Sequence, residues 1–479
     1  MSTVELAPGL RIARLVNGLW QIADRERSGQ KVDPREASKA MLPYVAAGLT
    51  TFDMADHYGS AEEIVGAFTQ AYPNQKIQAF TKWVPQPGPV SRADVRAAVD
   101  RACARLQTNR IDLMQFHAWS YAHPAWLDAL YFLSEEKEAG RIAHLGVTNF
   151  DTAHLHIALA SGISIVSNQV CFSLLDPRAA GAMSDLCKRF GVKLLAFGVL
   201  AGGFLSDKWL GKPEPVLNES LSWSQMKYKR FIDVAGGWEK FQALLHVLHT
   251  VARQHNTSIS TVAVRCMLDE PAVAGVMVGT RLTSAETIDE NKAALHLSLS
   301  ASDRDAIRAA QANLNPIPGD CGDEYRKPPF LTASGDLSHH VNNFPKPYPV
   351  KRDELGVAHA LSGTVWEDLA GFSRAVRKGN RILVSGTTST HGSRAIGGHD
   401  AAAQAHFVID KLEGALQSLG AKLENVVRTR IFIRNINEWE AVARAHGSRF
   451  AHIQPANTMV RADLIGDEYL VEIEAEAEL

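Results

Sequence analysis

The sequence predicts an α/β protein with two domains, a (β/α)8 TIM barrel followed by a smaller α+β domain. From residue 11 to about 295, short apolar runs alternate with amphipathic segments, and eight of each can be distinguished. Strict alternation is typical of parallel strands joined by helical crossovers, and eight such units favour closure into a barrel. An open doubly wound sheet is the alternative for this pattern. Beyond residue 315 the rhythm changes, which indicates a second unit.

The barrel elements follow one another along the chain. Continuous apolar runs are expected of strands buried on both faces, and they occupy 11–20, 50–55, 77–84, 110–119, 142–148, 164–170, 192–199 and 273–279. Apolar residues at helical spacing occupy 34–47, 60–70, 91–106, 124–139, 151–160, 178–190, roughly 238–270, and 284–295. The strands should therefore end on one common rim, where a barrel carries its reactive groups.

A proline-rich stretch separates the two units. Residues 316–349 contain seven of the chain's twenty prolines and the polar cluster GDCGDEYRKPP. Little periodicity and many prolines indicate an extended tail and linker. We therefore assign residues 1–315 to the barrel, 316–364 to the tail and linker, and 365–479 to the second domain.

The second domain shows a mixed α+β pattern. A hairpin signal at Lys378-Gly379-Asn380 comes first. Helices are expected at 401–420 and 437–451, and strands at 426–435, 457–465 and 470–479. In the last strand, apolar residues alternate with glutamates, which is typical of a strand with one buried face.

Composition excludes several classes of protein. Lys+Arg 50 against Asp+Glu 52 gives a net charge of −2, and 46% of the residues are hydrophobic. These values are typical of a globular protein with no nucleic-acid or membrane-surface partner. The five cysteines include no CxxC pair, so neither a disulfide framework nor a metal site is expected. The N-terminus lacks the apolar core of a signal peptide, and no apolar stretch approaches 18 residues. Together with the scattered cysteines, this predicts a reducing, cytoplasmic setting.

Four polar residues fall at the ends of expected barrel strands. They are Asp53, Tyr58, Lys82 and His117. Each alone has an ordinary structural explanation as a turn, cap, solvated or core residue. Together on one rim they suggest proton transfer, because a lysine ammonium near a tyrosine oxygen favours the phenolate and lowers the tyrosine pKa. An aspartate can keep that lysine charged, and a histidine can bind the substrate oxygen as it gains negative charge.

Residues 1–340 resemble an aldo-keto reductase through DMADHYGSAE, FTKW and LMQFHAW, which carry the four residues at that family's spacing. The resemblance implies Tyr58 as general acid/base, Lys82 and Asp53 as its tuners, and His117 as orienter. It also implies an NADPH/NADP cofactor. GVTNF, SNQV, AFGVLAGGFLSDKW and VGTRLTSAETIDEN resemble its cofactor-binding segments. The implied cofactor residues are Thr148, Asn149, Gln169, Phe197, Leu200, Ser206, Lys208, Gly279, Arg281 and Asn291, and Trp20 is implied at the substrate.

One barrel segment leaves two readings open. Residues 211–237 contain the aromatic and basic stretch SLSWSQMKYKRF. It is either the solvated edge of a lid or a cover over the substrate or cofactor.

Residues 365–479 resemble the RidA/YjgF family through GFSRAV, GNRILVSG, LQSLGAKLENVVRTRIFI, QPANTMV and VEIEAEA. The resemblance implies a chorismate-mutase-like fold that trimerises, with ligand clefts between subunits. Its active members use the arginine of a PAR segment, but this chain has Pro455-Ala456-Asn457. We place Ser385, Asn457 and Glu472 at the implied cleft. Glu472 also belongs to an exposed acidic stripe, which is the favoured explanation for it.

These observations predict an NADPH-dependent reductase of an aldehyde, ketone or sugar-like carbonyl, joined to a RidA-like module that binds a ligand or forms a homotrimer. One alternative is a cofactor-binding sensor or interaction protein. Another is a reductase coupled to imine or enamine processing.

Overall fold

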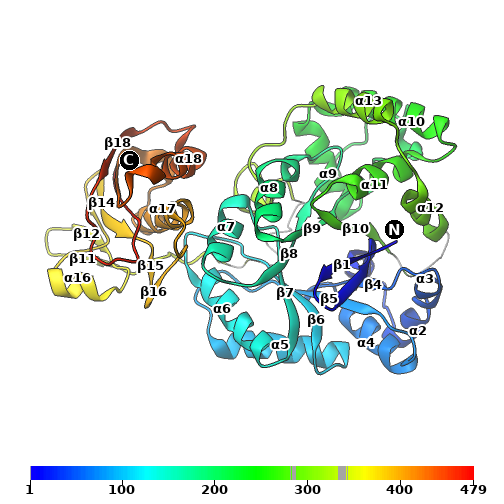
Figure 1. Ribbon diagram of the computed structural model, residues 1–479, viewed down its shortest axis with the longest axis horizontal. Helices are drawn as coiled ribbons and strands as arrows, with labels where there is room; N and C mark the ends of the chain where they lie inside the picture. Colours follow the sequence, from blue (N-terminus) through cyan, green and yellow to red (C-terminus); the bar gives the residue numbers. More distant parts are fainter. Residues whose placement is uncertain (1, 219, 281, 283–286, 333–340, 342) are drawn as a thin grey trace.

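The computed structural model describes residues 2–218, 220–280, 282, 287–332, 341 and 343–479. It contains a closed barrel of eight parallel strands in the order β10-β3-β4-β5-β6-β7-β8-β9 (Figure 1). This confirms the barrel over the open sheet. The strands are β3 Leu15–Gly18, β4 Thr51–Asp53, β5 Gln78–Trp83, β6 Ile111–Phe116, β7 Ile142–Thr148, β8 Ile165–Cys171, β9 Lys193–Phe197 and β10 Val273–Gly279.

Helices surround the barrel. They are α1 Trp20–Arg27, α2 Pro34–Lys39, α3 Leu42–Ala46, α4 Ala61–Ala71, α5 Arg92–Leu106, α6 Ala125–Glu138, α7 Thr152–Ala160, α8 Ala182–Phe190, α9 Trp223–Val234, α10 Gly237–Gln254, α11 Ile259–Asp269, α12 Thr287–His296, α13 Ala301–Ala312 and α14 Asp323–Arg326. Short 3-10 turns lie at Arg178–Ala180, Ala201–Gly203 and Asp207–Trp209. No helix among the described residues is both long and apolar enough to cross a membrane.

The first expected strand, 11–20, is wrong in its extent. An N-terminal hairpin of β1 Thr3–Ala7 and β2 Leu10–Ala13 takes its first part, and Trp20 already begins α1. The apolar side chains of the hairpin pack against Phe80, Leu113 and Leu195 of the barrel strands. Two apolar strands joined end to end look like one long run, because both are buried.

Two expected helices are broken in the structure. The helix at 34–47 divides into α2 and α3, with Pro43 in the first turn of α3, because proline lacks the amide hydrogen that a helix interior needs. The helix at 238–270 divides into α10 and α11 at Asn256, whose φ is 49°. Ser258 then caps α11 by accepting a hydrogen bond from the Thr261 amide. The helices α9 and α13 were not predicted, and residues 284–286 of the last expected helix lie outside the described part of the chain.

The second domain is a seven-stranded sheet in the order β11-β12-β13-β14-β19-β17-β18. Its strands are β11 Val350–Arg352, β12 Ala358–Ala360, β13 Ala375–Lys378, β14 Arg381–Thr388, β17 Val426–Ile433, β18 Ala456–Arg461 and β19 Val471–Glu478, and a small hairpin is formed by β15 Thr390–His391 and β16 Arg394–Ala395. The helices are α16 Val365–Ala370, α17 Ala401–Ser418 and α18 Trp439–Phe450, with 3-10 turns at Leu423–Asn425 and Ile436–Glu438. The expected linker 316–364 therefore includes two strands of this sheet.

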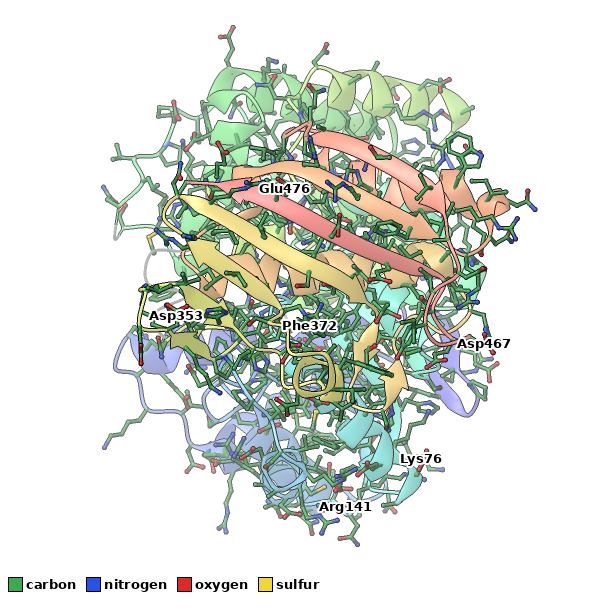
Figure 2. All side chains as sticks on the ribbon, turned by 90° about the vertical axis from the view of Figure 1, so that its left-hand side faces the viewer. Lys76, Arg141, Asp353, Phe372, Asp467 and Glu476 are labelled. Atoms are coloured by element: carbon green, nitrogen blue, oxygen red, sulfur yellow. The ribbon has the colours of Figure 1, made fainter. Side chains whose placement is uncertain are left out.

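The two faces of this sheet differ. Apolar residues of β14, β17 and β19 pack against α17 and α18, as the alternation in β19 predicts. The opposite face is open and carries ion pairs such as Arg381–Glu476 at 2.8 Å (Figure 2). Leu383, Val427 and Val460 are exposed hydrophobic residues of β14, β17 and β18.

The barrel and the second domain meet where α7 lies beside α17 (Figure 1). His154 of α7 is held between two carboxylates, Asp151 at 2.6 Å on Nδ1 and Asp410 of α17 at 2.9 Å on Nε2. A second pair joins His156 to Asp400 at 2.8 Å. These contacts connect the loop after β7 directly to the second domain.

Candidate active site

The structure places the four predicted catalytic residues on one rim of the barrel. Asp53 is the last residue of β4, Lys82 lies near the end of β5, and His117 directly follows β6. Tyr58 lies in the loop between β4 and α4. The strands are neighbours in parallel register, with Asp53 opposite Phe80 and Lys82 opposite Gln115. Parallel strands end on one side, which brings these side chains together.

Lys82 and Asp53 form a buried ion pair. The Nζ atom of Lys82 donates to Asp53 Oδ2 at 2.5 Å and to the Met54 carbonyl at 2.8 Å. Both side chains are about 95% buried, at 4% and 5% exposure. Burial lowers the pKa of Lys82, and the negative charge of Asp53 opposes this effect. The pair therefore keeps an ammonium in a water-poor site.

Tyr58 lies against this ammonium. Lys82 Nζ is 4.9 Å from the centre of the Tyr58 ring. Trp20 packs edge-on against the ring, with centroids 5.0 Å apart, and His57 does so at 4.9 Å. His57 also contacts Asp56 Oδ1 at 2.9 Å. The polar loop after β4 thus frames one phenol beside a buried cation, with Trp20 as its neighbour.

His117 is oriented by the next strand. Its Nδ1 lies 3.3 Å from the Thr148 carbonyl. Because a carbonyl only accepts, this contact needs a proton on Nδ1. The ring is also packed edge-on against Trp119 at 4.5 Å and Tyr325 at 5.7 Å. These contacts fix the ring orientation, so His117 can present Nε2 to a ligand without a change of rotamer.

The segment after β7 suits a carboxamide. Asn149 is mostly buried with φ of 58°, and its Oδ1 has no hydrogen-bond partner within the described part of the chain. A buried acceptor without a partner is costly, so a ligand N–H there would be favourable. Thr148 donates its hydroxyl to the Gln169 carbonyl at 3.0 Å. Gln169 uses its amide nitrogen for Asp53 at 2.9 Å and Gln115 at 3.0 Å.

The remaining predicted cofactor residues lie on three segments of the same rim. Phe197 ends β9, and Leu200, Ser206 and Lys208 lie in the loop that follows. Gly279 ends β10, where a Cβ would lie 2.3 Å from Gln21 Nε2. Asn291 lies in α12, and Arg281 lies outside the described residues. Among the described residues, no group of three His, Cys, Asp or Glu side chains is arranged to hold a metal ion.

Residues 211–237 divide between the two readings, because 211–218 are mostly exposed whereas helix α9 contacts Phe197 at the rim. Their helix α9 buries Lys227, whose Nζ donates to Tyr325 Oη at 2.7 Å and lies 5.0 Å from the Phe197 ring. Burial opposes the charge of Lys227, but Tyr325 and Glu324 outweigh it and raise its pKa. Lys227 and Tyr325 were not among the residues predicted for the site. The aromatic and basic stretch and the polar cluster GDCGDEYRKPP were the available signals.

The three residues placed at the RidA-like cleft do not come together within one chain. Glu472 pairs with Phe432 and faces the open side of the sheet, whereas Asn457 pairs with Thr429, which is buried on the helix side. Asn457 Nδ2 donates to Thr429 Oγ1 at 2.9 Å. Ser385 donates its hydroxyl to the Ser373 carbonyl at 2.8 Å. Glu472 and Asn457 therefore do not belong to one site within a single chain.

Two buried cations of the second domain escaped the sequence analysis. Arg374 donates through Nη1 to the Gly386 carbonyl at 2.7 Å and to Thr387 Oγ1 at 2.8 Å. Lys411 donates to the Thr388 and Thr390 carbonyls, and burial lowers its pKa to about 7. Burial raises the pKa of Glu472, and Arg374 opposes this effect. Arg374 thus places positive charge near Glu472 in the absence of the PAR arginine.

Comparison with known proteins gives matches for both halves. A sequence model of the Aldo/keto reductase family matches residues 14–312, and one of the Endoribonuclease L-PSP family matches residues 365–479. Flagellar radial spoke protein 5 of Chlamydomonas reinhardtii is 28% identical over 257 residues, 45% of this chain and 49% of that protein. The chain thus spans about half the length of that relative. An uncharacterised protein of Streptomyces coelicolor is 34% identical over 122 residues, 25% of this chain and 91% of that protein.

A solved structure agrees with the barrel. The glycerol dehydrogenase of Gluconobacter oxydans has a TM-score of 0.56 at 20% identity, over 67% of this chain and 98% of that one. At this identity the likeness concerns the fold alone. The first family match covers more than half of the chain and includes all four rim residues. The chain belongs to the aldo/keto reductase family of oxidoreductases and carries a RidA/YjgF-family domain after its barrel.

Proposed function

We propose that the barrel reduces an aldehyde or ketone with NADPH, and that Tyr58 donates the proton. The observation that carries this proposal is the buried Lys82–Asp53 pair beneath the Tyr58 ring on the reactive rim. A phenol is a weak acid in water. An adjacent ammonium stabilises its conjugate base and so makes it a better acid.

The chain's own residues account for the proton half of the reaction. A nicotinamide cofactor, when bound, would supply the hydride that the carbonyl carbon accepts. Tyr58 gives its proton to the carbonyl oxygen, and Lys82 stabilises the phenolate that remains. Asp53, held by Gln115 and Gln169 at 2.9 Å each, keeps Lys82 charged. His117 orients the carbonyl oxygen toward Tyr58, and Trp20 bounds the substrate beside it.

The cofactor would be held along the loops after β7, β9 and β10. The unpartnered Asn149 Oδ1 fits a carboxamide N–H, and Phe197 offers a ring for stacking. The choice of NADPH over NADH rests on Arg281, which the family resemblance assigns to the 2′-phosphate.

We further propose that the second domain assembles the protein as a homotrimer in the cytoplasm. The open sheet face supports assembly, since Leu383 and Val460 on it are 45% and 43% exposed. These exposed apolar residues lie among ion pairs such as Arg381–Glu476, and burial against a partner would stabilise them. The five free cysteines support a reducing compartment.

A second candidate function is a cofactor-binding subunit of a larger assembly. It is favoured by the relative whose name describes a flagellar spoke component. The two candidates differ in turnover, because only a reductase needs Tyr58.

The test is NADPH oxidation by the full chain with a panel of aldehydes and ketones, compared for the wild type, Tyr58→Phe and the control Tyr72→Phe. Loss of a general acid typically costs about 10²–10⁴-fold in rate. We expect that loss for Tyr58→Phe, with NADPH affinity retained, and wild-type rates for Tyr72→Phe. Unchanged turnover in Tyr58→Phe would remove the proton-donor role.

A further inference from the structure

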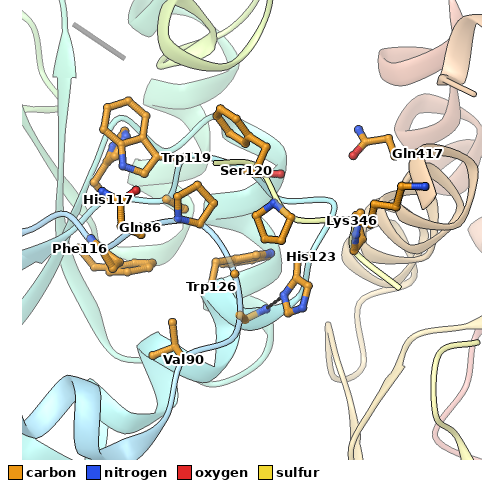
Figure 3. Close-up of a pocket in the computed structure, with 18 residues that line it drawn as sticks. Gln86, Val90, Phe116, His117, Trp119, Ser120, His123, Trp126, Lys346 and Gln417 are labelled. Carbon is orange, nitrogen blue, oxygen red and sulfur yellow. Dashed lines mark hydrogen bonds between the residues drawn. The ribbon is translucent and has the colours of Figure 1, made fainter. Parts of the chain in front are cut away.

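A cavity of about 160 Å³ lies between the reactive rim and the second domain (Figure 3). Its inner side is formed by His117 and Trp119 after β6. Its outer side is formed by linker residues 344–347 and by Gln417 of α17. One cavity therefore starts at a predicted catalytic residue of the barrel and ends at residues that lie beyond the aldo/keto reductase match.

The outer wall is held in place from both sides. Lys346 Nζ donates to the Ser418 carbonyl at 3.3 Å, and the Tyr348 amide donates to Ser418 Oγ at 2.9 Å. On the barrel side, a Cβ on Gly88 would lie 3.3 Å from Pro345 Cγ. The linker is thus attached to the end of α17 and also touches the loop after β5.

The helix behind the wall is equally close to the barrel. A Cβ on Gly414 of α17 would lie 2.5 Å from the Ala122 carbonyl oxygen, so only glycine fits at this approach. The buried His154–Asp410 pair joins the same helix to α7. Because both backbones are fixed, the cavity is formed before a ligand arrives.

The lining combines apolar residues with the amide of Gln417. Phe344, which is 53% exposed, lines the cavity together with Pro345, Pro347, Pro87 and Trp126, and no carboxylate is among the lining residues. The Gln417 amide points toward the cavity, whereas the Lys346 ammonium points toward α17 (Figure 3). Gln417 is an exposed residue at the open end of the cavity, and its Nε2 donates to Glu413 Oε1 at 3.1 Å, which leaves Oε1 as its acceptor atom.

We propose that Phe344 and Gln417 form the outer, specificity-determining wall of the barrel's substrate cavity. The substrate is then a flat carbonyl compound with a hydroxyl or other hydrogen-bond donor at the end remote from the carbonyl. This inference rests on the proposed reductase function and adds a role for the second domain in it. The size agrees, because a protein cavity of about 150 Å³ is large enough for benzene.

The experiment uses the full chain and two aldehydes of equal shape. 4-(Hydroxymethyl)benzaldehyde carries the donor, and 4-ethylbenzaldehyde replaces its hydroxyl with a methyl group. Steady-state kinetics with NADPH are measured for the wild type, Gln417→Leu, Phe344→Ala and Phe330→Ala. Phe330 is the matched control, since it is an exposed phenylalanine of the same tail that does not line the cavity.

The expected effects fall on KM and differ between the variants. Gln417→Leu should lower the hydroxymethyl-to-ethyl ratio of kcat/KM about two- to tenfold, the range of one neutral hydrogen bond. Phe344→Ala should raise KM about fivefold for both aldehydes through lost apolar contact, with kcat within about twofold. Phe330→Ala should match the wild type.

Two results would overturn the inference: a Phe344→Ala variant with wild-type KM for both aldehydes, or an unchanged ratio in Gln417→Leu. If the wild type reduces neither aldehyde, the proposed function is what fails for this class. The proposed wall is then tested by titrating the protein with 4-(hydroxymethyl)benzaldehyde. Binding is monitored through the indole fluorescence of the cavity residues Trp119 and Trp126. Equal affinity of wild type and Phe344→Ala in that titration rejects it.

Discussion

The buried contact between His154 and Asp410 provides the sharpest test of how the two domains are joined. Asp410→Asn keeps the size of the side chain and removes one charge from α17. In the wild type, Asp410 accepts from His154 Nε2 at 2.9 Å and from Arg449 Nη1 at 2.6 Å. Its side chain is only 2% exposed. The substitution therefore leaves two cationic groups without their shared carboxylate.

The size of the effect follows from this burial. Removing one partner of a buried ion pair typically costs about 3–5 kcal/mol. A matched control exists in the same interface, where His391 contacts Asp128 at 2.8 Å with side chains 22% and 33% exposed. A partly exposed pair is worth about 0–1 kcal/mol. At about 1 °C per kcal/mol for a chain of 479 residues, Asp410→Asn should lower the calorimetric midpoint by about 3–5 °C, and Asp128→Asn by at most about 1 °C.

The pH dependence gives a second, independent signature. Burial opposes protonation of His154, but Asp151 and Asp410 outweigh it and raise its pKa above the ordinary 6.5. A raised pKa stabilises the folded state fully below pH 6.5, and this contribution is lost as pH rises through the folded value. The pKa of Asp410 is instead lowered from 3.8 against the effect of burial, by His154 and Arg449. Its contribution is present above pH 3.8 and is lost as pH falls through the folded value.

The difference between the wild type and Asp410→Asn should therefore be largest between about pH 4 and 6.5. It should shrink at higher pH, where His154 loses its proton. Calorimetric scans across this range measure it. Equal midpoints for Asp410→Asn and Asp128→Asn at pH 6 would refute the reasoning. Burial would then have no effect on how much an ion pair contributes to the free energy of unfolding.

Three further predictions concern the cofactor and the second domain. NADPH should bind more tightly than NADH, and Arg281→Ala should remove a preference of about 1.5–3 kcal/mol in isothermal titration; equal affinity of the wild type for both cofactors would contradict it. Light scattering of the full chain should give about three times the 52.3 kDa of one chain, and a monomer mass would rule out assembly. The second domain should hydrolyse 2-iminopropionate slowly, since Asn457 replaces an arginine whose loss costs about 2–5 kcal/mol. Asn457→Arg should be faster, and brisk wild-type hydrolysis would show that another group, such as Arg374, binds the carboxylate.

Much of the barrel could be predicted because its signals are local. Strands β5 to β10 fall within two or three residues of the apolar runs. A strand buried on both faces consists almost entirely of apolar residues, so it is easily recognised. The rim residues followed from the same pattern. Asp53 and Lys82 had to meet once their strands were neighbours in a parallel barrel.

Elsewhere, local signals were ambiguous. The N-terminal hairpin merged with the first barrel strand, because two buried strands in succession have one composition. Strands β11 and β12 are three residues each, too short to show a period, so they were assigned to the linker. The cover formed by Lys227 and Tyr325 joins segments 98 residues apart, and no spacing in a sequence reveals such a contact.

The sequence by itself determined the barrel, the common rim that carries Asp53, Tyr58, Lys82 and His117, and the presence of a second α+β unit. The alternation of apolar runs and amphipathic segments involves residues close together in the chain, so the sequence alone indicates it. The tertiary structure alone decided that Glu472 and Asn457 face opposite sides of their sheet, and that linker residues and Gln417 border a cavity that starts at His117. The faces of Glu472 and Asn457 follow from the register of β17, β18 and β19, whereas the cavity depends on how α17 packs against α7. That packing is fixed by buried ion pairs and a glycine-sized gap between residues hundreds of positions apart.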